Sequence, residues 1–361
     1  MSSRSIDSFD SVLALAREDI HGLKAYEHAQ WRPELERLHA NELPWSPLSC
    51  TDGAPRHHYP EPQPAELVEA MAGYYGVAAD QILLGRGSDE GIDLLTRAFC
   101  RAERDAVMVC PPTFGMYAVA ATIQGAGVVS VPLRPDFQLD LPAICSALQG
   151  SAAAPIKLVW LCSPNNPTGN SLQRSDIAAV IDAARGRAVV VVDEAYAEFS
   201  SEPSWILSLP KNPHLVVLRT LSKAHGLAGL RVGAVIGHRA IIQLLRKIIP
   251  PYALPTDSVR LATIAMEGAA LAVTRERVGL LSRERERLRS ALSSSPWLTR
   301  IWPSAANFLL VEARDGRAVL ERLAGVGLIV RDFRGKSGLG EAIRITVGTP
   351  DQNDRIIRSL S

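Results

Sequence analysis

The chain has 361 residues, of which 47% are hydrophobic, so it is long enough to bury a large core and to form about two domains. Its 39 basic and 38 acidic side chains leave a formal net charge of +1, which gives no reason to expect binding to nucleic acid or to an anionic membrane. The five cysteines include no C-x-x-C pair, so neither a disulfide framework nor a zinc site is expected, and we predict no metal.

The first 52 residues are predicted to form an arm rather than a domain. They show no clear hydrophobic period, and residues 44–64 are dense in proline. Residues 1–20 lack the continuous apolar stretch of a signal peptide, and no run in the chain approaches the roughly 20 apolar residues that span a bilayer. We therefore expect a soluble protein of the reducing cytoplasm.

Short β-branched runs alternate with helical patterns through residues 53–252. The runs lie at residues 82–84, 106–109, 128–131, 158–162, 188–192 and 215–218. This alternation predicts an α/β domain with a mostly parallel sheet between layers of helices. In such sheets, ligands bind outside the carboxyl ends of the strands.

A second, smaller unit is predicted over residues 253–361. Pro250, Pro251 and Pro255 interrupt the chain after the helical stretch 240–249, and we place the domain boundary there. Long helical segments follow over 258–293. Strands are then predicted at 307–311, 328–331 and 343–346, with a helix at 317–324, which makes this unit α+β.

The strongest local signal is T-L-S-K-A-H-G-L-A-G-L-R at residues 220–231, directly after the strand 215–218. It places Lys223 at the end of a strand, close to the hydroxyls of Thr220 and Ser222. By itself an S-K pair is compatible with an ordinary solvated lysine. An enzyme that forms a Schiff base needs more: an amine that can lose its proton, a phosphate site and a carboxylate that faces a pyridine nitrogen.

Asp193 is the candidate carboxylate, because it directly follows an apolar strand. An ionised aspartate keeps a pyridine ring protonated, and the protonated ring withdraws electrons from the substrate. The alternative interpretation of Asp193 is a helix N-cap, which is common for an aspartate after a strand.

The candidate phosphate site is the turn G-R-G-S-D-E-G at residues 85–91, which follows a strand and opens a helix. Backbone N–H groups of Gly87, Ser88 and Asp89 would bind the anion at the helix N-terminus. Ser222 and Arg231 could complete the site with a hydroxyl and a guanidinium group. Ser-Asp-Glu is also an ordinary capping sequence, so this signal is weak alone.

The motif C-S-P-N-N-P-T-G at residues 162–169 also follows a strand and builds a rigid turn. Together, S-P-N-N-P-T-G, D-E-A-Y and S-K-A-x-x-L-A-G-L-R resemble the fold-type I aminotransferases. Within them the chain is similar to the histidinol-phosphate aminotransferase family, through L-x-A-N-E at 38–42, Y-P-E-P-Q-P at 59–64, the segment 86–100, C-P-P-T-F-G-M-Y at 110–117 and R-I-T-V-G-T at 344–349. The resemblance implies a large domain with a mostly parallel seven-stranded sheet and a smaller α+β C-terminal domain.

The resemblance also assigns the cofactor, pyridoxal 5′-phosphate, and its contacts. It makes Lys223 the residue that carries the cofactor as a Schiff base and moves a proton during catalysis. Asp193 becomes the partner of the pyridinium nitrogen, and Asn166 and Tyr196 become hydrogen-bond partners of the phenolic oxygen. Phe114 would stack on the pyridine ring, where many relatives have tyrosine.

The remaining assignments concern the substrate and a second subunit. Tyr59 would reach the cofactor phosphate of the neighbouring subunit, which implies a homodimer with shared active sites. Arg344 and Arg331 would bind the acidic group of the substrate. Tyr26 and Asn41 in the arm match positions that enclose the substrate in relatives.

The implied reaction is transfer of an amino group from L-histidinol phosphate to 2-oxoglutarate in L-histidine biosynthesis. A threonine-phosphate decarboxylase or an aromatic amino acid aminotransferase would share Lys223, Asp193 and Asn166, so these motifs leave both alternatives open. A cofactor-binding regulator is a remote alternative, since we see no helix-turn-helix domain before the fold. Tyr252 is a weaker substrate candidate, and His225 is expected to be a spacer.

Overall fold

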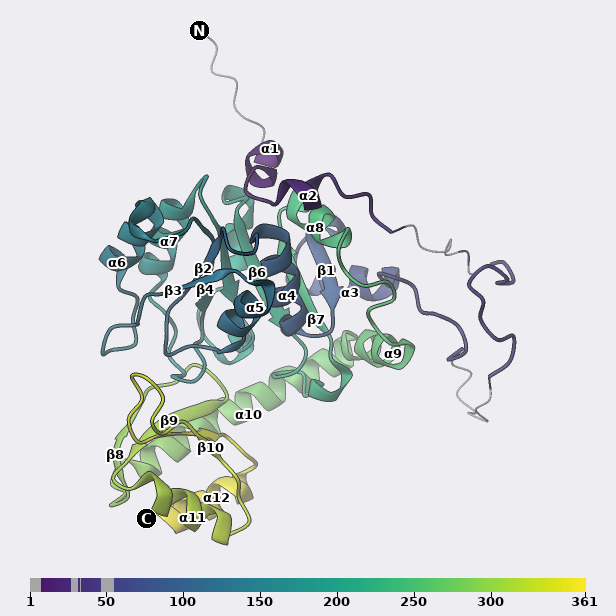
Figure 1. Cartoon of the computed structure of the whole chain (residues 1–361). Helices are drawn as coiled ribbons and strands as arrows, with labels where there is room; N and C mark the ends of the chain where they lie inside the picture. Colours follow the sequence, from purple (N-terminus) through teal and green to yellow (C-terminus); the bar gives the residue numbers. More distant parts are fainter. Residues whose placement is uncertain (1–7, 27–31, 33, 47–54) are drawn as a thin grey trace.

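The computed structural model describes residues 8–26, 32, 34–46 and 55–361; Cys50 and the expected end of the arm at residue 52 lie outside them. Two bodies are visible, a larger one around a long sheet and a smaller one at the C-terminus (Figure 1). Helix α10 (Gly268–Leu292) runs from the larger body to the smaller one.

The larger sheet has seven strands in the order β1-β7-β6-β5-β4-β2-β3. All neighbouring pairs are parallel except those that involve β7, so the predicted mostly parallel seven-stranded sheet is confirmed. Its strands are β1 (Ile82–Gly85), β2 (Ala106–Val109), β3 (Gly127–Ser130), β4 (Ile156–Cys162), β5 (Val189–Asp193), β6 (Leu215–Thr220) and β7 (Gly233–Gly237). Strand β7 was not predicted, because glycine at both ends of a five-residue run weakens the strand pattern.

Helices cover both faces of this sheet, which is why its central strand is apolar at every position. In β5, Val190 and Val192 pack into one core, whereas Val189 and Val191 pack into the other. Helices α3 (Ala65–Tyr75), α6 (Leu141–Ser146), α7 (Arg174–Ala184) and α9 (Thr256–Ala265) contribute to the first core. Helices α1 (Ser8–Leu13), α4 (Ser88–Phe99), α5 (Met116–Gln124) and α8 (Arg239–Arg246) contribute to the second.

The first described part of the predicted arm is anchored to the larger body. Val12 and Leu15 are buried in the second core, and the N–H of Arg17 donates to the carbonyl of Ala98. The short helix α2 (Glu18–His21) follows, and residues 34–46 then lie well away from the sheet, on the α9 side of the molecule (Figure 1).

The smaller body holds a four-stranded antiparallel sheet in the order β10-β11-β9-β8, with strands β8 (Leu298–Ile301), β9 (Phe308–Ala313), β10 (Arg331–Asp332) and β11 (Ala342–Thr346). The end of α10 packs on it together with α11 (Gly316–Gly325) and α12 (Pro350–Leu360). The strand predicted at 328–331 is wrong in its first three residues, because the N–H of Leu328 donates to Leu323 and closes the end of α11 instead. Strand β8 was missed.

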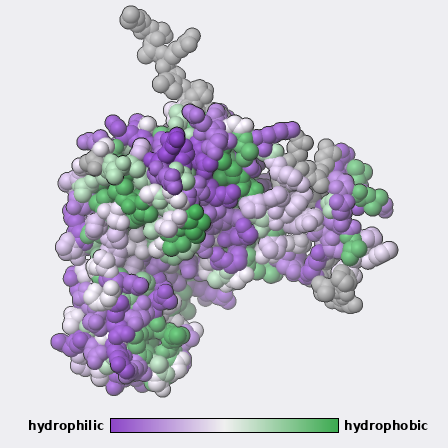
Figure 2. Space-filling view, viewed as in Figure 1, coloured by the Kyte–Doolittle hydropathy of each residue, from purple (hydrophilic) through white to green (hydrophobic). Residues whose placement is uncertain are grey.

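Helix α9 and the end of α10 pack on different cores. Ala262 and Met266 lie in the first core of the larger body, whereas Leu288 and Leu292 lie in the core of the smaller one. The boundary expected between residues 252 and 253 stays a prediction. No helix in the described part of the chain is long and apolar enough to cross a membrane. Hydrophilic and hydrophobic residues are interspersed over the visible side of both bodies (Figure 2).

Candidate active site

A cavity of about 810 Å³ lies where loops at the carboxyl edge of the large sheet meet the loop between β10 and β11. Strands β4, β5 and β6 are parallel neighbours, so the residues that follow them share one edge of the sheet. The cavity is lined by most of the residues that the sequence singled out: Ser88, Asp89, Phe114, Asn166, Asp193, Tyr196, Thr220, Ser222, Lys223, Arg231, Arg331 and Arg344.

Lys223 follows β6 and faces this cavity. The surrounding protein removes water from its amine and lowers its pKa, and the positive charge of Arg344 acts in the same direction. Its Nζ atom lies 5.7 Å from the centre of the Tyr196 ring. A lysine with a lowered pKa loses its proton more readily near neutral pH, as a nucleophilic amine requires.

Asp193 ends β5 and is buried, with 3% of its surface exposed. Burial raises the pKa of its carboxyl to about 6, against hydrogen bonds that favour the charged form. The Tyr117 hydroxyl donates to Oδ2 at 2.7 Å, and the N–H of Ala195 donates to Oδ1 at 3.1 Å. Asp193 therefore accepts a bond within the turn that follows β5 and faces the cavity; it is not a helix N-cap, because the next helical turn starts at Ala197 with Tyr196 at its N-cap position.

A cradle for an anion is built where β1 meets α4. Gly87 adopts a φ of +80° just before the first residue of α4, Ser88. A Cβ atom on Gly87 would lie 2.8 Å from Nη2 of Arg231, and one on Gly233 would lie 2.7 Å from the backbone N of Ser88. Glycine at both positions thus lets strand β7 and the arginine approach the helix N-terminus, where N–H groups favour phosphate.

The hydroxyl and guanidinium groups predicted for this cradle converge on it. Arg231 donates to Ser222 Oγ at 3.4 Å and to Asp89 Oδ2 at 3.0 Å, and Thr220 donates to Ser222 Oγ at 3.0 Å. The carboxylate of Asp89 accepts a bond from Arg231, so toward an anion this residue can offer only its backbone N–H.

Arg331 and Arg344 are direct partners across the antiparallel pair β10 and β11. Like charges opposite one another on a sheet destabilise it unless an anion lies between them. Arg344 donates to Oδ1 of Asn166, while its buried Nε has no hydrogen-bond partner among the described residues. Burial also lowers the pKa of Arg344. This arrangement is suited to an anionic group of a substrate.

The residues at this site fit pyridoxal phosphate. They provide an amine with a lowered pKa, a buried carboxylate, a glycine cradle at a helix N-terminus and an aromatic ring, Phe114, in the cavity wall. Among the described residues, no group of three His, Cys, Asp or Glu side chains is placed to hold a metal ion.

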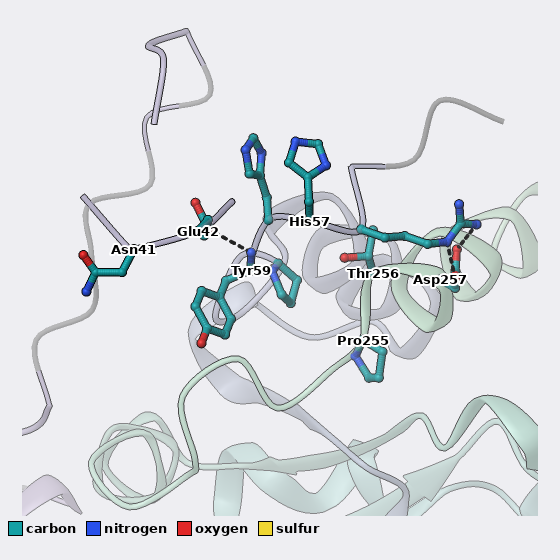
Figure 3. Close-up of a pocket in the computed structure, with 10 residues that line it drawn as sticks. Asn41, Glu42, His57, Tyr59, Pro255, Thr256 and Asp257 are labelled. Atoms are coloured by element: carbon teal, nitrogen blue, oxygen red, sulfur yellow. Dashed lines mark hydrogen bonds and ion pairs between the residues drawn. The ribbon is translucent and has the colours of Figure 1, made fainter. Parts of the chain in front are cut away.

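Tyr59 and Asn41 lie elsewhere. They line a separate cavity of about 430 Å³ together with Glu42, His57 and Asp257 (Figure 3). The Tyr59 ring stacks on Tyr252 with centres 4.6 Å apart, and its N–H donates to Glu42 Oε1 at 2.6 Å. Tyr26 is 67% exposed and does not line the Lys223 cavity. A contribution of Tyr59 to a neighbouring subunit stays a prediction.

Some residues at the site had no predicted role. Lys336 and Ser337 line the cavity from the loop between β10 and β11. The sequence of this loop contains no motif that would have predicted a role for them. Tyr117 belongs to C-P-P-T-F-G-M-Y, but its bond to Asp193 joins residues 76 positions apart. His225 lies outside the cavity; its side chain is fully buried, with Nε2 4.0 Å from Glu198.

Comparison with known proteins agrees with this geometry. Residues 27–360 match the family model for aminotransferase class I and II. The chain is 46% identical to a histidinol-phosphate aminotransferase of Xylella fastidiosa, over 97% of this chain and 96% of that protein. It is 44% identical to a histidinol-phosphate aminotransferase of Stenotrophomonas maltophilia, over 98% and 97%.

Among solved structures, the chain is similar to a histidinol-phosphate aminotransferase from Sinorhizobium meliloti in complex with pyridoxal-5′-phosphate. The TM-score is 0.76 at 27% identity, over 84% of this chain and 82% of that one. An L-threonine-O-3-phosphate decarboxylase from Porphyromonas gingivalis shares the fold, with a TM-score of 0.70 at 23% identity, over 84% and 89%.

Proposed function

Because the chain belongs to the class I and II aminotransferases, we propose that it transfers the amino group of L-histidinol phosphate to 2-oxoglutarate. The products are imidazole acetol phosphate and L-glutamate, and the reaction belongs to L-histidine biosynthesis. The observation that carries this proposal is the pair of facing arginines, Arg331 and Arg344, in the cavity that Lys223 enters. The identity of 44–46% to histidinol-phosphate aminotransferases over nearly the whole chain supports it.

The cofactor is pyridoxal 5′-phosphate, which supplies an electron sink for the α-carbon of a bound amine. Lys223 would hold it through its amine, and Asp193 would pair with the protonated pyridine nitrogen. The cradle of Gly87, Ser88 and Arg231 would bind its phosphate.

The other residues of the wall have matching roles in this proposal. Thr220 and Ser222 would add hydroxyls to the phosphate cradle, with the backbone N–H of Asp89. Asn166 and Tyr196 would donate to the phenolic oxygen, and Phe114 would pack against the ring.

Lys223 would also move the proton that the reaction requires. Its lowered pKa favours the neutral amine, which can accept a proton from the α-carbon of the substrate. Arg331 and Arg344 would hold the substrate by its phosphate, or 2-oxoglutarate by its distal carboxylate, so that the α-carbon stays within reach.

The active form in this proposal is a homodimer of the cytoplasm with shared sites. Tyr59 lines a separate cavity and is half exposed, as a residue that serves a neighbouring subunit would be. Asn41 lies beside it, and Tyr26 on the same arm is also exposed. The described cysteines, Cys100, Cys110, Cys145 and Cys162, are free, which suits a reducing compartment.

The test is a rapid-mixing experiment that follows the near-visible absorbance of the bound cofactor. We expect histidinol phosphate to bleach this absorbance much faster than threonine phosphate or phenylalanine does, and 2-oxoglutarate to restore it. Release of carbon dioxide from threonine phosphate, or faster bleaching by phenylalanine, would contradict the proposed donor. Light scattering at low protein concentration checks the dimer.

A further inference from the structure

Tyr117 lies on α5, behind the wall of the cavity, and is not one of the residues that line it. Its side chain is fully buried, and its hydroxyl donates to Oδ2 of Asp193 at 2.7 Å. A buried donor with a short bond to a carboxylate stabilises the ionised form of that carboxylate.

The Tyr117 ring is held from two sides, so its hydroxyl has little freedom to turn away. It stacks on Trp160 of β4, with ring centres 5.0 Å apart and planes 3° apart. The ring of Phe114 meets it edge to face, with centres 5.6 Å apart and an angle of 83°. Tyr117 thus contacts both the carboxylate and the aromatic ring that face the cofactor site.

We propose that Tyr117 is a positioning residue that keeps Asp193 ionised in a single orientation and holds Phe114 at the cavity wall. This inference rests on the proposed function, because it gives Asp193 and Phe114 their roles toward the cofactor. Tyr117 itself need not touch cofactor or substrate. The N–H of Ala195 fixes the other carboxylate oxygen, so the two donors together set the plane of the carboxylate.

The electrostatic surroundings explain why Asp193 needs such a donor. Burial raises the pKa of Asp193 to about 6, and the negative charges of Asp89 and Glu194 act in the same direction, whereas the bond from Tyr117 lowers it. The ionisable groups that face Asp193 are Asp89 on α4, Tyr117 on α5, Cys162 on β4, Glu194 and Tyr196 on the following turn, and Lys223 after β6.

The experiment compares full-length Tyr117→Phe with the parent enzyme by titration with pyridoxal phosphate between about pH 5 and about pH 9. We expect the dissociation constant at neutral pH to rise about tenfold, as the loss of one hydrogen bond to a charged group implies. Affinity should fall toward acid pH, and we call this fall the acid limb of the affinity profile. In Tyr117→Phe the acid limb should move to higher pH, because Asp193 then binds its proton more tightly.

Tyr75→Phe is the matched control. The Tyr75 hydroxyl is also buried, but by distance and angle it has no hydrogen-bond partner in the described part of the chain. This variant should leave both the affinity and the acid limb unchanged. In an Asp193→Asn background, Tyr117→Phe should produce no further change in affinity, because the charge it stabilises is gone.

An unchanged acid limb in Tyr117→Phe, or an equal shift in Tyr75→Phe, would overturn the inference. If Tyr117→Phe does not fold, 3-fluorotyrosine at position 117 keeps the ring and strengthens the donor. The acid limb should then move to lower pH, and an unmoved limb would again overturn the inference. A parent that fails to use histidinol phosphate, with the shift still present, would reject the proposed donor and leave the role of Tyr117 intact.

Discussion

The pair of facing arginines gives the sharpest test of the proposed substrate. Replacing Arg344 by glutamine removes the charge that faces Arg331 and leaves a shorter, neutral polar side chain. Two consequences follow from the geometry. The substrate loses a guanidinium partner, and the sheet loses a like-charge contact, so substrate binding should weaken while the fold keeps its stability.

Hydrogen bonds to charged groups contribute about 1.5–3 kcal/mol each. At about 1.4 kcal/mol for each factor of ten, loss of one such bond raises KM for histidinol phosphate by a factor between about 10 and about 150. The melting temperature should stay the same or rise slightly, because the repulsion between Arg331 and Arg344 is relieved.

The assay measures KM for histidinol phosphate and for L-histidinol, which lacks the phosphate, in the parent and in Arg344→Gln. The variant should lose most of the preference for the phosphorylated substrate and keep its affinity for pyridoxal phosphate. Arg300→Gln is a matched control, since Arg300 lies on β8 of the same sheet, over the Trp302 ring and outside the cavity.

An unchanged preference for the phosphorylated substrate in Arg344→Gln would refute this reasoning. The same holds if KM for L-histidinol rises as much as KM for histidinol phosphate, since the arginine would then not contact the phosphate.

Four further predictions concern the lysine, the pH dependence of Asp193 and the glycine cradle. Lys223→Ala should abolish amino transfer without loss of melting temperature, because the protein around the amine already disfavours its charged form. Turnover at the parent rate would assign the proton transfer to another group. Affinity for pyridoxal phosphate should fall as the pH drops through about 6, where Asp193 takes up a proton. Titrations with the cofactor at several pH values measure this, and an affinity that does not change with pH would mean that another group pairs with the ring. The pKa of Asp193 is higher in the folded state than in the unfolded chain, so ionisation of Asp193 reduces the stability of the fold as the pH rises from about 4 to about 6. Asp193→Asn should flatten this dependence of the melting temperature on pH. Gly233→Ala should lower the free energy of unfolding by about 1–3 kcal/mol, because its Cβ would lie 2.5 Å from the backbone carbon of Gly87. In the control Gly237→Ala, the Cβ would lie 3.3 Å from a Val216 side-chain atom, so the loss should be far smaller. Equal melting temperatures for the two variants would contradict the prediction that Gly233 is crowded by backbone.

Local patterns predicted most of the large sheet, because each of its central strands is a short apolar run next to a helix with its own period. The run at 188–192 predicted a strand of a sheet between two layers of helices, and the cores on the two faces of β5 confirm this. The same method failed at β7, where glycines flank the strand, and at 328–330, where apolar side chains lie in a helix-terminating turn. Apolar character alone does not distinguish a strand from a buried turn.

Asn41 and Tyr59 show a second limit. Tyr59 was expected at the cofactor phosphate of a neighbouring subunit and Asn41 at the substrate; within this chain both line a separate cavity, and their roles stay predictions. A residue that serves a neighbouring subunit leaves no trace of that role in the local pattern, because the contact is made with a second copy of the chain.

The sequence by itself determined which residues stand at the ends of the strands: Lys223 after β6, Asp193 at the end of β5 and the glycine turn before α4. These are local features, since a strand, its final residue and the next turn are neighbours along the chain. Only the tertiary structure decided what lies opposite them. The strand register sets Arg331 against Arg344, and the packing of α5 on the sheet brings the Tyr117 hydroxyl to Asp193. Such contacts depend on how distant segments pack together, and no short stretch of sequence contains that information.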